Sequence, residues 1–403
     1  MPQYDHNINT QERNEVTARV TSSREQNQPI PFVDLQAQRA RLMPELEARM
    51  AVVFEHGRYI LGPEVAELEK ALAGRADVGH CIACASGTDA LLMGLMQSGV
   101  GPGDAVFLPA FTFTATAEVV LTAGAVPVFV DVDAASFNMD PMDLERRIEA
   151  TSGQLRPRVV IVVDLFGAAA DYDALRGVAD KHGLVVLADA AQSFGGMLHD
   201  RPVGALAPLT ATSFFPAKPL GCYGDGGALF TDDEEMAATL RSIGAHGKGG
   251  GKYDIVRAGL NSRLDTLQAA VLLAKLTVFE DEIVARQRVA ARYDARLRDL
   301  VAVPARRNGV YSAWAQYTIQ TERRDALASG LRVRGIPTAV YYPLPMHLQP
   351  AYAKYGDGAG AHPVSEALCG RVLSLPMHPY LDDATVDRIC DAVEDVLRDA
   401  AAA

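Results

Sequence analysis

The stretch Thr212-Ser213-Phe214-Phe215-Pro216-Ala217-Lys218-Pro219-Leu220-Gly221 places a lysine just after an apolar run and between two prolines. Each proline fixes its own backbone angle, so the loop that carries Lys218 is expected to be stiff. The chain has only seven lysines among its 38 basic residues, so few others compete for a special role. A lysine held at a strand end and shielded from water can have a lowered pKa and form a Schiff base. An ordinary solvated lysine is the alternative.

On both sides of Lys218, from about residue 79 to residue 232, short apolar runs alternate with helical patterns. Strands are expected over residues 80–85, 105–108, 126–132, 159–164, 185–189, 210–214 and 227–231, with helices over 88–97, 115–122, 141–150 and 172–182. Strands rich in Val, Ile and Leu that alternate with helices predict an α/β fold with both faces of the sheet covered. Functional residues in such folds lie on the loops at the strand ends.

The length of 403 residues predicts two structural units. Residues 1–29 are polar and are expected to form a disordered tail. Residues 30–275 would form an N-terminal segment and a large domain, and residues 276–403 a smaller C-terminal domain. Helical periodicity predicts a helix over 36–54, kinked or restarted at Pro44, and one long helical region over 265–300. The segments 310–321, 325–334 and 383–398, the last two helical, would build the smaller domain.

Composition excludes several classes of function. With 38 Lys and Arg against 50 Asp and Glu, the net charge of −12 argues against a nucleic-acid-binding protein, although a local phosphate pocket stays possible. No run of 18 apolar residues is present, so no membrane span is expected. The five scattered cysteines form no disulfide framework, and Cys81 and Cys84 are expected to be buried strand residues, with a redox pair as the alternative. The histidines lack metal-ligand spacing, so no metal is expected. The N-terminus lacks an apolar signal core, which predicts a reduced, cytoplasmic setting.

If Lys218 forms a Schiff base, pyridoxal phosphate is the natural cofactor, and it makes three further demands. Its phosphate needs backbone N–H groups at a helix start, which Ser86-Gly87-Thr88-Asp89 can supply. Its pyridine nitrogen needs a carboxylate, and Asp189 ends an apolar strand. Its ring needs an apolar face, which Phe113 could provide. Each signal has an ordinary alternative: a helix cap at 86–89, a cap of a following helix by Asp189, and a core position for Phe113.

These residues occur within longer motifs that resemble those of fold-type I pyridoxal-phosphate enzymes, and specifically the sugar aminotransferases of the DegT/DnrJ/StrS family. The resemblance runs from about residue 31 to the C-terminus. It implies an aspartate aminotransferase-like fold, with a mixed, mostly parallel seven-stranded sheet in the large domain and a smaller α+β domain. It rests on Leu-Gly-Pro-Glu-Val-Ala-Glu-Leu-Glu at 61–69, Ser-Gly-Thr-Asp-Ala-Leu at 86–91, Asp-Ala-Ala-Gln at 189–192, Ser-Phe-Phe-Pro-Ala-Lys at 213–218, Gly-Asp-Gly-Gly at 224–227 and Gly-Leu-Asn-Ser-Arg-Leu-Asp at 259–265.

The resemblance implies a role for each matching residue. Lys218 would form the Schiff base and Asp189 would pair with the pyridine nitrogen, while Gln192 would bond the ring hydroxyl. Phe113 would stack on the ring. The phosphate would be held by Gly87, Thr88, Asp89 and Ser213, and by Asn261 from a neighbouring subunit, which implies a homodimer with shared active sites. Ala188 stands where many relatives have Glu, a residue with no catalytic role.

The implied reaction is transamination in two half-reactions. Glutamate would give its amino group to the cofactor, with Lys218 as general base and acid, and a nucleotide-linked keto-sugar would then accept it. Family members with histidine at the lysine position are dehydratases, so lysine favours transamination. There are two alternatives. One is another fold-type I activity, such as a dehydratase, decarboxylase or amino-acid aminotransferase; the other is a non-enzymatic regulator that binds pyridoxal phosphate.

The sugar is suggested by a closer resemblance to UDP-2-acetamido-2-deoxy-3-oxo-glucuronate aminotransferases, enzymes of bacterial surface polysaccharide synthesis. It rests on the runs 215–227 and 261–268 and on Ser-Leu-Pro-Met-His-Pro-Tyr-Leu at 374–381. Arg263 could bind the carboxylates of uronate and glutamate in turn, with a structural ion pair to Asp265 or another acid as the alternative. Tyr341 and Tyr342 are expected to line the sugar pocket. Relatives often have His at the place of Tyr341, so a dTDP-linked 3-keto-6-deoxyhexose, or a 4-keto sugar, is the second candidate.

Overall fold

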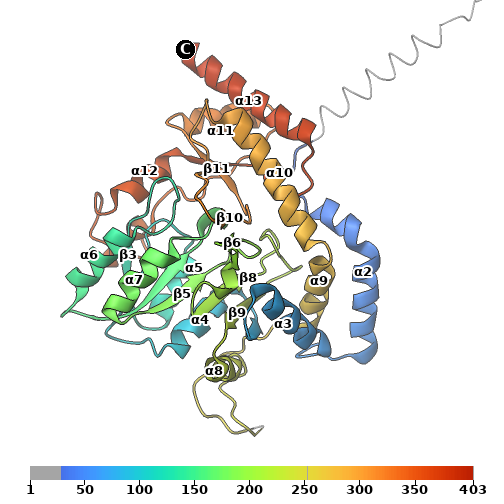
Figure 1. Cartoon of the computed structure of the whole chain (residues 1–403), viewed down its shortest axis with the longest axis vertical. Coiled ribbons are helices and arrows are strands. Elements are labelled where there is room, and N and C mark those ends of the chain that lie inside the picture. The colour runs from blue at the N-terminus through green and yellow to red at the C-terminus, as the bar shows by residue number, and fades with distance from the viewer. Residues whose placement is uncertain (1–28, 252, 403) are drawn as a thin grey trace, which may run out of the picture.

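The protein is built around a seven-stranded sheet, seen here in a computed structural model that describes residues 29–251 and 253–402 (Figure 1). All but the last residue of the expected tail therefore lies outside the described residues. The seven strands lie in the order β1 (His80–Cys84), β9 (Gly227–Thr231), β8 (Leu209–Ser213), β5 (Val185–Asp189), β4 (Arg156–Val163), β2 (Asp104–Pro109) and β3 (Val126–Val130). The predicted strands are all confirmed, each end lying within three residues of its expected position.

Six of these strands run parallel, and β9 alone runs against its neighbours β1 and β8. Side chains alternate between the two faces of the sheet, as the strand pleat requires. In β2, for example, Val106 and Leu108 pack on one face and Ala105 and Phe107 on the other, and all four are fully buried. Both faces are therefore covered, as the near-continuous apolar strands predict.

Helices cover the two faces in separate groups. One face packs against α4 (Gly87–Gln97), α5 (Ala115–Thr122) and α8 (Glu234–Gly244). The other packs against α6 (Pro141–Thr151) and α7 (Tyr172–His182) at one end and α3 (Pro63–Ala76) and α9 (Thr266–Leu276) at the other. The N-terminal α2 (Leu35–His56) lies along α9 and continues through Pro44. Neither α3 nor α8 was among the predicted helices.

The helical region predicted over 265–300 is confirmed, but it contains two helices, α9 and then α10 (Phe279–Leu297). At the break the Thr277 hydroxyl donates to the Ala274 carbonyl oxygen at 2.6 Å, and Val278 has φ −117° and ψ −1°. A side chain that bonds the preceding turn competes with the helical hydrogen bonds. The apolar periodicity continues across this break, so the pattern alone does not reveal it. The domain boundary expected at residue 275 lies just before the break and stays a prediction.

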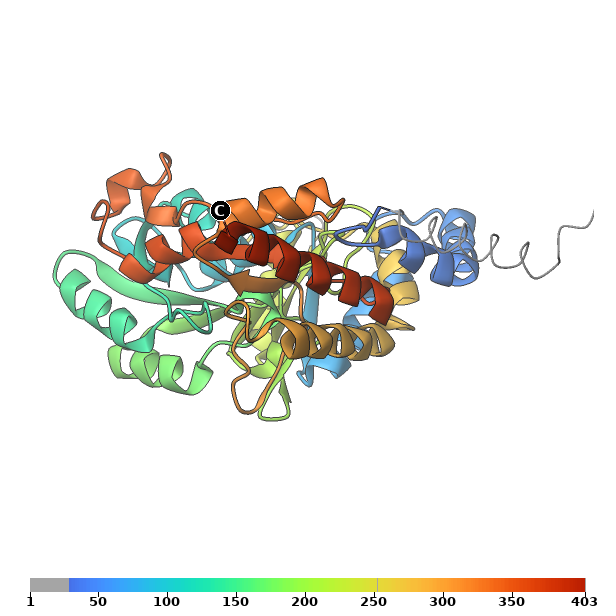
Figure 2. The same cartoon turned by 90° about the horizontal axis from the view of Figure 1, so that it is seen from above.

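The C-terminal part has its own core, formed by α10, α11 (Arg324–Val333), α13 (Asp383–Ala402) and a two-stranded sheet of β11 (Tyr317–Gln320) and β12 (Val372–Leu375). Figures 1 and 2 show α10 and α13 side by side at the end of the molecule opposite α8. Segment 310–321 is divided, since β10 (Val310–Tyr311) joins β6 (Met197–Leu198) and β7 (Arg201–Pro202) in a third sheet. The remaining elements are α12 (Pro363–Arg371) and the short helices η1 (Leu165–Gly167), η2 (Val203–Ala205), η3 (Met346–Leu348) and η4 (Ala353–Tyr355).

Because β1, β2, β5 and β8 are parallel, the loops after them leave the sheet at one edge. Those loops begin at residues 85, 110, 190 and 214, and they carry or adjoin the predicted cofactor residues other than Asn261. This edge is where α/β sheets place their functional groups. No helix of the described residues is long and apolar enough to cross a membrane.

Candidate active site

Lys218 lies in a tight turn after β8, where its backbone N–H bonds the Phe215 carbonyl oxygen at 2.9 Å. The side chain is half-buried, and its amine has no hydrogen-bond partner among the described residues. Burial lowers the pKa of Lys218, and the nearby Asp189 carboxylate partly offsets that effect. A lowered pKa increases the fraction of neutral amine, which is the form that attacks a carbonyl and accepts a proton. The alternative of an ordinary solvated lysine does not fit this position.

Asp189 ends β5 and is only 7% exposed. Burial raises its pKa, while the N–H of Ala191, the charge of Lys218 and the hydroxyl of Thr116 lower it. The Thr116 hydroxyl donates to Oδ2 at 3.2 Å and the Ala191 N–H donates to Oδ1 at 3.1 Å. A turn, rather than a helix, follows Asp189, so the alternative of a helix cap is wrong. A buried carboxylate without an ion pair is a candidate partner for a cationic ring nitrogen.

The start of α4 forms a close junction with the ends of β8 and β9. Ser86 is the N-cap, and its hydroxyl accepts the Asp89 N–H at 3.0 Å. The N–H groups of Gly87 and Thr88 precede the first helical bond and have no acceptor among the described residues. A methyl group at Gly87 would lie 2.5 Å from Cβ of Ser213, so only glycine allows this contact. The junction therefore presents two free backbone N–H groups and the hydroxyls of Thr88 and Ser213, a set suited to a phosphate.

The predicted ring-binding residues lie close to one another. The ring of Phe113 is 52% exposed and its centroid lies 6.3 Å from that of Tyr342, so the alternative of a core position for Phe113 is wrong. Gln192 is buried, and its Nε2 donates to the Tyr342 hydroxyl at 3.4 Å. The Gln192 Oε1 accepts the Phe166 N–H at 2.8 Å, which fixes the orientation of the amide. Burial is the main reason that the pKa of Tyr342 is raised, so its hydroxyl stays protonated.

Tyr341 extends this aromatic wall toward the N-terminal segment. Its ring centroid lies 5.9 Å from that of Tyr342 and 6.4 Å from that of Phe32. Phe32 is held there in part by a bond from the Met377 N–H to its carbonyl oxygen. The structure therefore brings the two tyrosines together beside Gln192 and Phe113, with Phe32 as an additional neighbour.

Asn261 and Arg263 lie in a different groove, lined by Ile60, Ala85, Gly224, Asp225, Asn261, Arg263, Asp265 and Gln268. The Arg263 guanidinium donates to Oδ1 of Asn261 and forms no ion pair with any described carboxylate, Asp265 included. Its Nε is buried and without a partner. The groove does not include Lys218. Within one chain, Asn261 and Arg263 therefore lie apart from the Lys218 cluster, the name we give to Gly87, Thr88, Phe113, Asp189, Gln192 and Lys218.

The residues of the Lys218 cluster fit pyridoxal phosphate. The free N–H groups at Gly87 and Thr88 would hold its phosphate, and the unpaired carboxylate of Asp189 would hold its ring nitrogen. Lys218 supplies an amine with a lowered pKa, and Phe113 supplies an exposed ring face. These groups come from four strand ends that only the sheet brings together.

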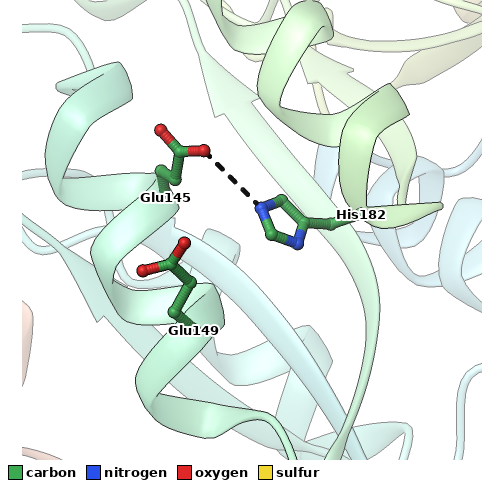
Figure 3. Close-up of side chains that lie close together, drawn as sticks. All are labelled: Glu145, Glu149 and His182. Atoms are coloured by element: carbon green, nitrogen blue, oxygen red, sulfur yellow. Dashed lines mark ion pairs between the residues drawn. The ribbon is translucent and has the colours of Figure 1, made fainter.

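A second group of polar side chains lies far from these strand ends. Glu145 and Glu149 on α6 face His182 at the end of α7, with Nε2 of His182 3.8 Å from Glu145 (Figure 3). Lys181 also pairs with Glu145, so a cation already occupies that carboxylate. These side chains are a surface ion-pair network.

The buried cysteines match the expected structural role. Cys81 and Cys84 lie in β1, and burial is the main reason that the pKa of each thiol is raised. All five cysteines of the chain are free and buried. The prediction of buried strand residues is confirmed, and raised pKa values disfavour the redox alternative because the thiolate is the reactive form.

Comparison with known proteins identifies the family. A model of the DegT/DnrJ/EryC1/StrS aminotransferase family matches residues 41–394. The chain belongs to this family. The UDP-2-acetamido-2-deoxy-3-oxo-D-glucuronate aminotransferase of Pseudomonas aeruginosa is 47% identical over 365 residues, which cover 90% of this chain and 99% of that protein.

Two solved structures of DegT/DnrJ/EryC1/StrS-like fold extend the match. A family aminotransferase from Brucella abortus has a TM-score of 0.89 and 55% identity, over 91% of this chain and 99% of that one. NtdA from Bacillus subtilis, solved with bound cofactor PMP, has a TM-score of 0.84 and 29% identity, over 93% of this chain and 87% of that one. These matches confirm the expected fold type, the family and the pyridoxal phosphate cofactor.

Sequence reasoning missed three residues that support the candidate site. Thr116 was expected only as part of a helix, Ser86 only as part of a motif, and Phe166 was not singled out. Thr116 lies in the first turn of α5, directly after the loop of Phe113, and that position is a signal that the sequence does contain. Phe166 acts through its backbone N–H, which no side-chain pattern reveals.

Proposed function

We propose that this aminotransferase moves the amino group of glutamate to C3 of UDP-2-acetamido-2-deoxy-3-oxo-glucuronate, in the synthesis of bacterial surface polysaccharide. The relative from Pseudomonas aeruginosa, which carries that activity in its name, supports the choice. The observation that carries it is Arg263, a guanidinium with a partly buried end and no carboxylate partner among the described residues. A uronate and glutamate both bring carboxylates, which arginine binds in a bidentate manner.

In this proposal each residue of the chain has a defined task. Lys218 would hold the cofactor through Nζ and, as a neutral amine, would take the proton from the glutamate carbon that loses its amino group; in the second half-reaction it would give a proton to the sugar carbon that gains the amino group. Asp189 stays ionised beside the ring nitrogen, and the hydrogen bond from Thr116 keeps its carboxylate oriented. When bound, the cofactor supplies the electron sink for proton removal at that carbon. Phe113 and Tyr342 exclude water from one side of the site.

The proposal includes a homodimer in which Asn261 and Arg263 serve the site of the partner subunit. Beside their groove the surface is apolar and exposed: Phe54, Tyr59, Ile60 and Leu61 are between 48% and 60% exposed. Exposed large apolar side chains of this kind are typical of a protein interface. A second copy of this chain would cover these residues and bring a guanidinium to the strand ends that hold Lys218. A reducing, cytoplasmic setting is also part of the proposal, because all five cysteines are free thiols.

The amino-donor step is tested by absorption spectroscopy. Protein loaded with pyridoxal phosphate should show the visible band of a lysine-bound cofactor, and glutamate should convert it to the aminated form. Lys218→Ala should abolish both the band and the conversion, whereas the surface variant Lys181→Ala should keep them. A loaded wild-type protein that does not respond to glutamate would refute the proposal.

The sugar is tested with four acceptors and the aminated enzyme: the UDP-linked 3-keto uronate, its 6-deoxy counterpart, a dTDP-linked 3-keto-6-deoxyhexose and a 4-keto sugar. We expect kcat/KM to be highest for the uronate. A higher value for the dTDP sugar would favour the second candidate. That candidate is included because Tyr341 stands where relatives often have His.

Shared sites are tested by mixing two inactive variants. Lys218→Ala and Arg263→Ala homodimers should each be impaired. Reassembled hybrids should regain activity, because one of their two sites then combines an intact Lys218 with an intact Arg263 from the other subunit. If mixing restores nothing while exchange of subunits is demonstrated, Arg263 acts within its own chain.

A further inference from the structure

A second pocket lies between the loops after β3 and β4 and the segment that leads from α10 to β11. Its apolar wall contains Phe137, Leu165, Phe166, Pro304 and Trp314, and its polar rim includes Arg306, Arg307 and Gln316. We call it the Trp314 pocket. Among its lining residues, Phe166 also supports the Lys218 cluster through the bond from its N–H to Gln192, and none lines the groove of Arg263.

The charges around the Trp314 pocket are unbalanced. Its lining contains two arginines and no acidic residue. Arg306 pairs with Asp294 and stacks over the Trp314 ring, with 5.2 Å from its guanidinium carbon to the ring centroid. Arg307 is half-buried, and its side chain has no ion pair or hydrogen bond with any described residue. A guanidinium in that position is available to an anion.

The rim also offers an acceptor. Gln316 Oε1 is buried and has no hydrogen-bond partner, whereas the other amides of the pocket are in use. The Asn138 amide bonds Leu165 and Ala168, and the Gln287 amide bonds Trp314 and Ser312. A ligand that fills the pocket would therefore meet one free cation and one free acceptor above an apolar wall.

The backbone of the wall is strained where the pocket is formed. Phe137, Phe166 and Trp314 have φ values of 64°, 61° and 50°, in the left-handed region that bulky side chains rarely adopt. Three of the eight non-glycine residues with positive φ among the described residues thus line this one pocket. Strain of this kind persists only where surrounding contacts enforce it, and it is concentrated at functional sites. Phe137 and Phe166 also pack edge to face, with 5.1 Å between their ring centroids.

We propose that the Trp314 pocket is a second ligand site, which binds a small planar ring that carries an anionic group and a hydrogen-bond donor. The anion pairs with Arg307, the donor bonds Gln316 Oε1, and the ring lies against the apolar wall. A nucleoside monophosphate and a hydroxylated aromatic carboxylate share this chemistry. The ligand of this pocket would not be a reactant in the amino-group transfer proposed above.

A ligand there would act on the other site through Phe166. The Phe166 side chain forms part of the pocket wall, while its N–H holds the Gln192 amide and its carbonyl oxygen accepts the Gln316 N–H at 3.4 Å. The pocket and the Lys218 cluster are therefore on opposite sides of one residue. Occupation of the pocket should restrict Phe166 and, with it, the amide expected to bond the cofactor ring.

The single tryptophan of the chain makes the pocket directly observable, because Trp314 lines it. The experiment titrates enzyme loaded with pyridoxal phosphate with uridine monophosphate and, separately, with 4-hydroxybenzoate, and follows tryptophan fluorescence. We expect at least one of the two to give a saturable change. Uridine and inorganic phosphate, which each lack one half of the proposed ligand, should bind at least about ten-fold more weakly.

Variants separate this pocket from the catalytic groove. Arg307→Gln should weaken the fluorescence response about ten-fold or more, and Arg307→Lys should restore part of it. Arg263→Ala should leave the response unchanged. The proposal is overturned if neither ring-bearing anion alters the fluorescence at millimolar concentration. It is also overturned if Arg263→Ala removes the response while Arg307→Gln does not, since the anion then binds only in the groove of Asn261.

Discussion

The hydroxyl of Thr116 donates a hydrogen bond to Oδ2 of Asp189 at 3.2 Å, and so joins the first turn of α5 to the end of β5. Both side chains are buried, with Thr116 fully excluded from solvent. The Thr112 hydroxyl lies 3.2 Å from that of Thr116 and completes a short chain of hydroxyls behind the carboxylate. The orientation of the acid thus depends on a loop that also carries Phe113.

Thr116→Val should therefore raise the pKa of Asp189 further, because this donor is one of the groups that lower it. A carboxyl with a higher pKa loses its charge at higher pH, so the acidic limb of the kcat profile should move upward in pH. The lost bond is worth about 1.5–3 kcal/mol for a charged acceptor, and we expect kcat to fall about ten-fold or more. Thr116→Ser keeps the donor and should resemble the wild type. An unchanged acidic limb in Thr116→Val would contradict this role.

Gly87→Ala should lower the affinity for pyridoxal phosphate by about ten-fold or more, since the new methyl would overlap Cβ of Ser213 and displace the start of α4. Equilibrium titration with the cofactor measures the change. The double variant Gly87→Ala, Ser213→Gly removes the overlap and should recover part of the affinity. Gly74→Ala, in an open position on α3, should leave cofactor affinity unchanged and stabilise the fold by about 0.5–1 kcal/mol. Equal losses at positions 87 and 74 would show that the contact does not matter.

Arg263→Ala should reduce kcat/KM for a UDP-linked 3-keto uronate far more than for the corresponding 6-deoxy sugar. The uronate loses a charge-assisted pair, worth about 1.5–3 kcal/mol, whereas the 6-deoxy sugar has no carboxylate to lose. Steady-state kinetics with both acceptors, starting from the aminated enzyme, separates this effect from the glutamate step. If both sugars lose the same factor, Arg263 does not recognise the uronate.

His362 should make the protein less stable in acid. Burial lowers its pKa to about 4, helped by Arg147 and His347 and opposed by Asp131 and Asp143. The unfolded chain binds a proton near pH 6.5, so stability is complete above that pH and is lost as the pH falls toward 4. The shift corresponds to about 3 kcal/mol at most. Urea unfolding at about pH 7.5 and about pH 5 should show a smaller pH dependence in His362→Gln than in the wild type; an equal dependence would exclude this histidine as the cause.

The sheet could be read from the sequence because its strands are apolar on both faces, and such runs have few other interpretations. The ends of helices were harder to predict from the sequence. Across Thr277 the apolar spacing continues, while a single hydroxyl bond to Ala274 stops the helix. The two strands within 310–321 were also hidden, because the positive φ of Trp314 that separates them is not encoded in any period.

In the site, the charged residues could be predicted from the sequence. The residues that orient other side chains through a hydrogen bond could not. Lys218 and Asp189 could be predicted because a charged group directly after an apolar strand is costly to bury unless it has a partner. Thr116 and Phe166 act on them or on Gln192 through one hydroxyl and one backbone N–H, both common in any sequence. Only the crossing of loops after β2, β4 and β5 shows that these atoms meet.

The place of β9 in the sheet sets an order of events during synthesis. The segment with Gly87 follows β1 and the segment with Lys218 follows β8, and β9 lies between these two strands and pairs with both. Since β9 ends at Thr231, the chain up to Lys218 does not yet contain the strand that joins these two segments. We therefore expect the cofactor site to form only once β9, the last strand of the seven-stranded sheet in chain order, has been synthesised.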